Sequence, residues 1–153
     1  MKVSEKAVEK MPKSSVFRAN LADAYRWAGQ RDKAAAAYDE AITLALKVTE
    51  VNPRHAGALG ILAICWSRKG DDARALQYIS QARQIKPTDK ELMYQEATIH
   101  ALAGRNAQAA ASLEEALRNG FSLQLAESDP ELAELRKTPE FGRLAKELTL
   151  KSP

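Results

Sequence analysis

Residues 56–89 decide the fold of this chain, and they read AGALGILAICWSRKGDDARALQYISQARQIKPTD. The first half has apolar residues at the i, i+3, i+4, i+7 spacing of one helical face, namely Leu59, Leu62, Ala63 and Trp66. The second half has another such stripe, namely Ala75, Ile79 and Ala82. Gly70 separates the stripes and can adopt the left-handed conformation that ends a helix. Pro87 ends the second stripe because it has no N–H to donate, so the segment predicts a hairpin of two helices.

The same pattern recurs along the chain. Shifted by 34 residues, the positions from Leu62 to Pro87 are matched by Glu96, Ala97, His100, Gly104, Ala109, Leu113, Ala116 and Phe121. Upstream they are matched by Leu21, Ala22, Tyr25, Gly29, Ala34, Tyr38 and Ala41. Gly29 lies 41 residues before Gly70, so the upstream unit has seven extra residues, between Ala41 and Pro53. Because seven residues are close to two helical turns, we expect its second helix to be longer.

The order of residue types in this unit is a small residue, an aromatic, Gly, Ala, a large apolar residue, Ala and Pro. This order resembles the tetratricopeptide repeat family, almost fully over 56–89 and less fully over 15–55 and 90–123. In the last unit Glu96 replaces the usual leucine and Phe121 the usual proline. The resemblance implies an all-α, right-handed superhelix (solenoid) of helical hairpins. The alternative is an unrelated helical bundle.

The spacing of Ala7 and Pro12 equals that of Ala82 and Pro87. Residues 1–14 are therefore expected to be the second half of a truncated repeat, which makes the chain a fragment or the tail of a longer array. The alternative is a native N-terminal capping helix.

After Gly120 the repeat pattern stops, and residues 124–153 predict a helical cap. Asp129-Pro130 and Thr138-Pro139 each place a capping side chain before a proline at the first helical position. Two short helices are expected, over 131–137 and 140–150. Their apolar residues can cover the last hairpin: Leu132, Leu135, Phe141, Leu144 and Leu148. Their charged residues are expected on the outer face: Glu131, Glu134, Arg136, Arg143, Lys146 and Glu147.

The C-terminal segment ALRNGFSLQLAESDPELAELRKTPEFGRLAKEL carries a second resemblance. It is similar to the tail that follows the repeats in bacterial receptor-type serine/threonine kinases and in some cyclase-linked signalling proteins. That resemblance implies a larger signalling protein as the parent of this chain.

Composition excludes several classes of protein. The chain has 153 residues, 45% apolar and 28% charged, as in an ordinary soluble domain. Its net charge of +3 comes from signs that are mixed along the sequence, which does not favour a nucleic-acid partner. The longest uncharged run, 56–67, is shorter than the roughly 20 residues of a membrane-spanning helix. We therefore expect no membrane insertion and no visible targeting segment, with the cytoplasm favoured.

The residues that could carry chemistry are few, and the sequence predicts no catalytic site, no cofactor and no metal. His55, Cys65 and His100 do not share helical spacing with other ligand types, and zinc needs three or four converging ligands. His100 stands at an aromatic core position, so we expect it to be partly buried and bonded to a neighbouring helix. His55 is expected to face solvent. Cys65 is expected to be a small apolar core residue without a base nearby.

The resemblance to tetratricopeptide repeats also implies that the first helix of each repeat lines a concave groove. The candidate protein-binding residues are Trp27, Arg26, Asp23, Ile64, Arg68, Tyr94 and Thr98. Aromatic residues would anchor a peptide or helix, and charged residues would orient it. The alternative is that the last helices, or another copy, fill the groove. The lysine and asparagine clamp by which some family members hold acidic chaperone tails is absent, since Ala19, Asp23, Gly60 and Ile64 occupy those positions.

These features predict a non-catalytic protein–protein interaction scaffold with a protein or peptide partner. We expect it to be the repeat region of a larger bacterial signalling protein, with a serine/threonine kinase as one candidate parent. The alternative is a self-association module that pairs through its N-terminal edge.

Overall fold

The computed structural model describes residues 14–151 of the chain. In this range the regular elements are all helical and no strand occurs. The helices are α2 (Ser15–Trp27), α3 (Arg31–Val51), α4 (Ala56–Arg68), α5 (Asp72–Ile85), α6 (Lys90–Leu102), α7 (Asn106–Arg118), α8 (Leu123–Ser128), the 3₁₀ helix η1 (Pro130–Leu132), α9 (Ala133–Arg136) and α10 (Pro139–Lys151). The expected all-α fold of helical hairpins is therefore confirmed. The half-repeat expected over 1–14 lies outside the described residues, apart from Ser14.

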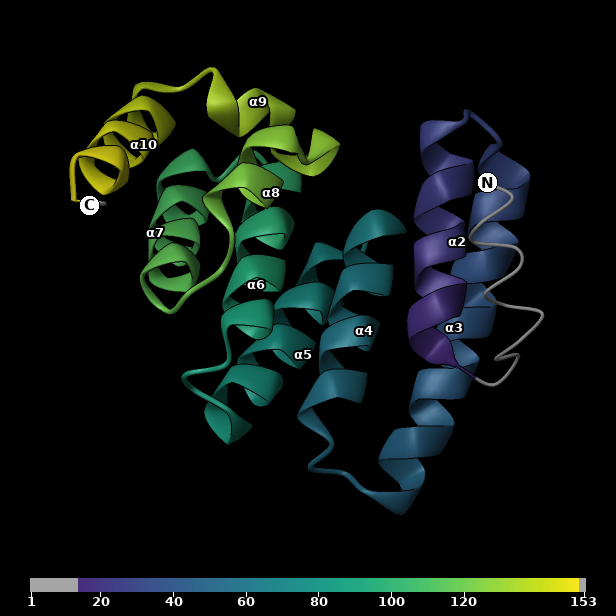
Figure 1. Cartoon of the computed structure of the whole chain (residues 1–153). Coiled ribbons are helices and arrows are strands. Elements are labelled where there is room, and N and C mark those ends of the chain that lie inside the picture. The colour runs from purple at the N-terminus through teal and green to yellow at the C-terminus, as the bar shows by residue number, and fades with distance from the viewer. Residues whose placement is uncertain (1–13, 152–153) are drawn as a thin grey trace. The chain divides into compact units, whose positions relative to one another are not determined.

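The chain divides into two compact units, of which the first ends at Ile85 and the second begins at Lys86. In the first unit, α2 pairs with α3 and α4 pairs with α5, and α4 also packs against α3 and α2. Each pair forms an antiparallel hairpin (Figure 1). Helix α3 has 21 residues and α5 has 14, so the seven extra residues extend the helix as expected.

Small residues let the two helices of each hairpin pack closely, and glycines form the turns between them. Ala41, Ala63, Ala75 and Ala82 are fully buried, and a missing side-chain volume at such positions lets helix backbones approach. Gly70 has a φ of 89° in the turn between α4 and α5, which only glycine adopts without strain. The N–H of Asp71 then donates to the carbonyl of Trp66 at 2.9 Å and closes the helix end.

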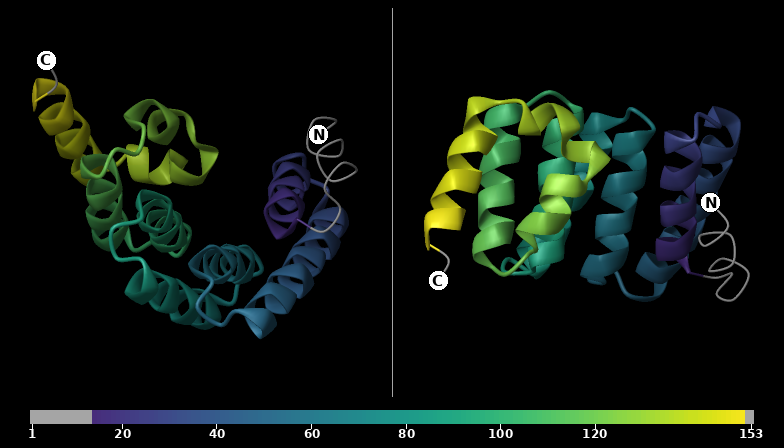
Figure 2. Two further views of the ribbon diagram at one scale, coloured as in Figure 1. Left: turned by 60° about the horizontal axis from the view of Figure 1, so that its bottom comes forward. Right: turned by 45° about the horizontal axis from the view of Figure 1, so that its top comes forward.

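In the second unit, α6 pairs with α7, and the C-terminal helices cover that hairpin (Figure 2). The core joins residues of the hairpin to residues of the cap: Ala97, Ala109, Leu113, Ala126, Leu132, Leu135, Phe141 and Leu144. Leu148 packs against it and is partly buried. The expected role of the apolar cap residues is therefore confirmed.

The cap contains one helix, α8, that the sequence did not predict. Helix α8 has six residues and buries only Ala126, so it has no apolar stripe that a periodic pattern could reveal. Its start is set by Ser122, whose side chain accepts the N–H of Leu125 at 3.2 Å. The helix expected over 131–137 is split, because Pro130–Leu132 is a 3₁₀ turn that runs into α9.

Arg136 was expected on the outer polar face, and this is wrong in part. Its guanidinium is half-buried and donates to the carbonyls of Ala126, at 3.1 Å, and Asp129, at 2.6 Å. Arg136 therefore ties the end of α8 to α9 by satisfying carbonyls that the broken helix leaves without helical partners.

Candidate functional site

A buried tyrosine organises the polar residues at the end of the first hairpin. Tyr38 of α3 is 2% exposed, and its hydroxyl donates to the carboxylate of Asp23 on α2. The Nε of Arg26 donates to the same hydroxyl oxygen at 3.2 Å. Burial, and next the Asp23 carboxylate, raises the pKa of Tyr38, so the hydroxyl keeps its proton and stays a donor. The network holds Asp23 and Arg26 in place on the last turns of α2.

Trp27 follows Arg26 at the C-terminal end of α2. Its side chain is 53% exposed, and the guanidinium carbon of Arg26 lies 4.8 Å from the centre of its ring. This distance allows a cation–π contact between the two side chains. Trp27 therefore exposes a large apolar surface to solvent, and the contact with Arg26 restricts the orientation of its ring.

A shallow cavity opens beside Arg26, among the ends of three helices. Its lining residues come from the end of α2, the start of α3 and the end of α4: Arg26, Arg31, Ala34, Ala35, Tyr38, Arg68 and Lys69. The cations at the ends of α2 and α4 suit the partial negative charge of a helix C-terminus. Lys69 is ion-paired with Asp39 of α3 and lies 5.6 Å from the centre of the Trp66 ring.

The structure brings four of the predicted site residues to this corner of the first unit: Asp23, Arg26, Trp27 and Arg68. Ile64 is only 8% exposed, so it offers little surface to a partner.

The cavity is also lined by Arg31, Tyr38 and Lys69, which the sequence prediction did not include because it assigned the site to the first helices alone. Arg31 and Lys69 flank the turns at Gly29 and Gly70. That shared position next to a turn was the signal that could have found them.

A family model described as tetratricopeptide repeat matches residues 19–90. These residues belong to the tetratricopeptide repeat family. A search of curated proteins finds no match to the chain. Tetratricopeptide repeats generally mediate protein–protein interactions, and the family is generally non-catalytic. The Asp23–Arg26–Tyr38 network and the cavity both lie within the matched repeats.

The two candidate residues in the next repeat hairpin are engaged inside the second unit. The ring of Tyr94 stacks on Phe121, with ring centres 3.9 Å apart and an interplanar angle of 11°. Its hydroxyl donates to Asp129, the residue that caps η1. Thr98 is 3% exposed and donates to the carbonyl of Gln95 at 2.8 Å. Tyr94 and Thr98 therefore both make contacts inside the second unit, and the binding surface proposed below does not include them.

The contacts of the two histidines and the cysteine give each of them a structural role in the repeats. His55 is exposed, as expected, and also caps α4, because its Nδ1 accepts the N–H of Ala58 at 3.0 Å. His100 is half-buried and its Nδ1 accepts from Nε of Arg105 at 2.8 Å, in the turn before α7. Cys65 is fully buried, and that burial raises the pKa of its thiol to about 12. Among residues 14–151, no three His, Cys, Asp or Glu side chains come together as a metal site.

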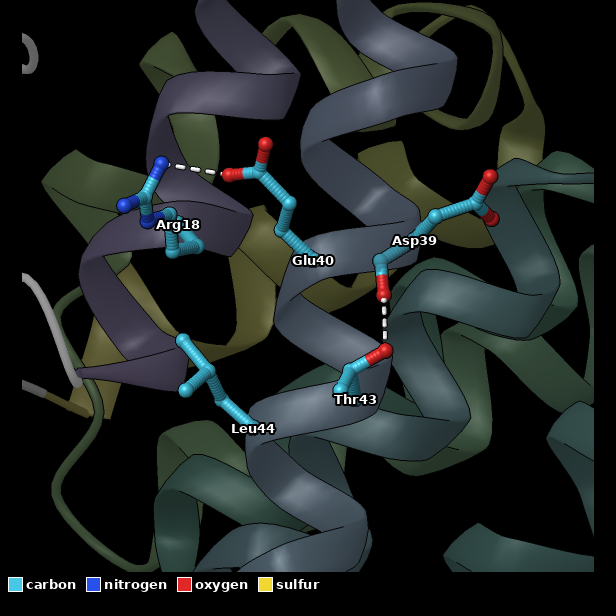
Figure 3. Close-up of a pocket in the computed structure, with 5 residues that line it drawn as sticks. All are labelled: Arg18, Asp39, Glu40, Thr43 and Leu44. Carbon is cyan, nitrogen blue, oxygen red and sulfur yellow. Dashed lines mark hydrogen bonds and ion pairs between the residues drawn. The ribbon is translucent and has the colours of Figure 1, made fainter.

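A second cavity of the first repeat is lined by residues of α2 and α3 (Figure 3). Arg18 and Glu40 point toward each other and form an ion pair. Thr43 donates its hydroxyl to the carbonyl of Asp39 at 3.0 Å, while the Asp39 carboxylate points away from Arg18. Arg18 is thus paired within the first repeat, and Asp39 is paired with Lys69 of the next repeat, so we assign no ligand to this cavity.

None of the helices in the described part of the chain has the length and apolar character to span a membrane.

Proposed function

We propose that the first two repeats form a non-catalytic protein-binding module, which takes a peptide or a short helix at the ends of α2, α3 and α4. The observation that carries this proposal is the exposure of Trp27, 53% of whose side chain is open to solvent. Tryptophan is enriched among the residues that dominate binding energy at protein interfaces. Its large, rigid ring loses little conformational entropy when a partner covers it.

The neighbouring side chains support the same role. Arg26 is held by both Tyr38 and the Trp27 ring, so the indole is oriented before a partner arrives. Such preorganisation lowers the entropic cost of binding. Arg26 and Arg68 line the cavity at these helix ends, and charges beside an interface chiefly change the association rate and its salt dependence.

The test uses peptides selected by the purified chain from a random displayed library. Their affinities are then measured by calorimetry for the wild-type chain, for Trp27→Ala and for Val16→Ala. Val16 is also an exposed apolar residue of α2, with 46% of its side chain open to solvent, so it is the matched control. Loss of an interface hot spot costs about 2 kcal/mol or more, and we expect Trp27→Ala to weaken binding about thirtyfold.

Val16→Ala is expected to leave these affinities almost unchanged. Peptides that bind Trp27→Ala as tightly as the wild-type chain would overturn the proposal, provided that both variants show equal helical circular dichroism.

A second candidate function is self-association, and an exposed apolar surface favours it. The extended part of α3 exposes 36% of Val48 and 89% of Val51, which are three positions apart and line one cavity together with Leu44. Contiguous exposed apolar residues often mark interaction surfaces. Light scattering over a range of concentrations tests this candidate, with Val51→Asp as the variant expected to abolish any dimer. A wild-type chain that stays monomeric would remove it.

We also propose that the chain is the repeat region of a larger bacterial signalling protein, with a serine/threonine kinase as one candidate. The similarity of the C-terminal cap sequence to the tails of such proteins supports this proposal. The sequence encoded before Met1 tests it, since a kinase, cyclase or receptor segment there is the expected result.

A further inference from the structure

We propose that the cavity at the ends of α2, α3 and α4 binds an acidic side chain of the partner peptide, beside the position of Trp27. This inference rests on the proposed function and adds the chemistry of the partner. Four cations contribute to the lining of the cavity: Arg26, Arg31, Arg68 and Lys69. No carboxylate belongs to the described lining residues.

The volume of the cavity is sufficient for one or two side chains of a partner peptide. Its volume is about 340 Å³, near the lower end of the range of about 300 to 1,000 Å³ for ligand pockets. Ala34 and Ala35 leave this space, because larger side chains at the start of α3 would fill it. A glutamate or aspartate of an extended peptide can therefore enter, whereas a whole helix cannot.

Charge complementarity selects an anion over other polar groups. Arginine presents planar, bidentate donors that match a carboxylate. The cavity lies at the N-terminal end of α3, whose dipole adds positive potential, and at the C-terminal ends of α2 and α4, whose dipoles add negative potential. The preference for an anion therefore rests on the four side-chain cations and not on the helix dipoles. Lys69 already pairs with Asp39, so an incoming carboxylate would share or replace this exposed contact.

Asp23 and Asp39 reduce the positive charge near the cavity, but four cations against two carboxylates still leave a local charge of +2. The Asp23 carboxylate accepts the hydroxyl of Tyr38, and Asp23 is not among the lining residues. This site also differs from the lysine and asparagine clamp on the first helices, because Arg31 and Lys69 lie at the turns.

The experiment follows backbone amide shifts by nuclear magnetic resonance while an acetylated, amidated tetraglutamate peptide is added at low salt. We expect shifts at Arg31, Ala35 and Lys69 that vanish at high salt, because screening weakens exposed charge pairs. Tetraglutamine should cause none. Shifts spread over the whole surface with tetraglutamate would overturn the inference.

Inorganic phosphate is titrated in parallel, to separate a carboxylate site from a phosphate site. Phosphate that moves the same amides at lower concentration than tetraglutamate would overturn the choice of an acidic side chain. Weaker or absent phosphate shifts at these amides would support it.

The matched variants are Ala35→Glu and Ala36→Glu. Both residues are exposed on α3 and both variants have the same net charge, but only Ala35 lines the cavity. A glutamate at position 35 places a competing carboxylate among the cations. We expect Ala35→Glu to weaken tetraglutamate binding about tenfold and Ala36→Glu to have little effect, since electrostatic complementarity is local.

Equal weakening by both variants, or by neither, would overturn the inference. Selected peptides that depend on Trp27 but tolerate Ala35→Glu would overturn it as well and would leave the proposed function standing. Peptides that do not depend on Trp27 would instead overturn the proposed function, whatever tetraglutamate does.

Discussion

Tyr38 shows how one side chain can link the packing of a repeat to its surface. The ring lies in the core, while the hydroxyl joins a carboxylate and a guanidinium that reach the surface. A buried polar group is tolerated only when it is hydrogen-bonded. Asp23 and Arg26 thus satisfy Tyr38, and Tyr38 in turn fixes them.

The hydroxyl of Tyr38 can be tested by Tyr38→Phe, which keeps the ring. We expect the free energy of unfolding to fall by about 1 to 2 kcal/mol, because Asp23 loses a donor and Arg26 an acceptor. Urea denaturation followed by circular dichroism measures this. The control is Tyr78→Phe at a half-buried position of α5, expected to stay within about 0.5 kcal/mol of wild type. Equal losses in both variants would contradict the role of the network.

Cys65 makes a prediction about pH. Burial raises the pKa of its thiol from 9.0 to about 12, so the unfolded chain loses this proton first. The stabilising contribution is therefore complete below pH 9 and is lost as the pH rises through 12. Relative to Cys65→Ala, the wild-type chain should lose unfolding free energy over this window. Urea titrations of both chains at several pH values measure the difference, and a constant difference would contradict the prediction.

At the scale of elements, helix pairing could be predicted because it depends on spacing that the sequence displays. Gly70 and the alanines of 56–89 set where helices end and how closely they pack. Helix α8 could not be predicted, since only Ala126 is buried in it. The contacts of Tyr94 also could not be predicted, because the chain after α7 brings Phe121 and Asp129 to it. Periodicity reports which face is apolar, but it does not report which later segment covers that face.

Close pairing of α4 and α5 is tested by adding volume at its alanines. Ala75→Leu or Ala82→Leu should lower the free energy of unfolding by about 1 to 3 kcal/mol, because overpacking forces the backbones apart. Arg83 on α5 is half-buried, so it does not serve as an exposed control. The control is Ala73→Leu, since Ala73 is exposed on the same helix. Equal melting temperatures for the Ala73 and Ala75 variants would show that the small residues do not set the helix spacing.

At the scale of the whole molecule, the C-terminal helices share a core with the hairpin of their own unit. In a repeat array each unit mainly stabilises those next to it, and terminal units need a covering element. Here α8 to α10 supply that covering for the α6–α7 hairpin. The proposed binding site at the ends of α2, α3 and α4 lies in the other unit, on helices that have their own core. The cap is therefore expected to matter for the folding of the second unit more than for binding at Trp27.

Leu135→Ala tests this division. Leu135 is 1% exposed in the cap core, and truncating a buried leucine costs about 2 to 5 kcal/mol. Hydrogen exchange followed by mass spectrometry should show the largest loss of protection in α6, α7 and α10 and the smallest in α2 and α3. The control is Leu125→Ala, at a position of α8 that is 59% exposed, and it should leave hydrogen-exchange protection unchanged in both groups of helices. Binding of the selected peptides should be retained by Leu135→Ala at temperatures where the first unit stays protected. A uniform loss of protection from α2 to α10 would show instead that the two units unfold together. The cap would then stabilise the proposed binding site as strongly as it stabilises the α6–α7 hairpin.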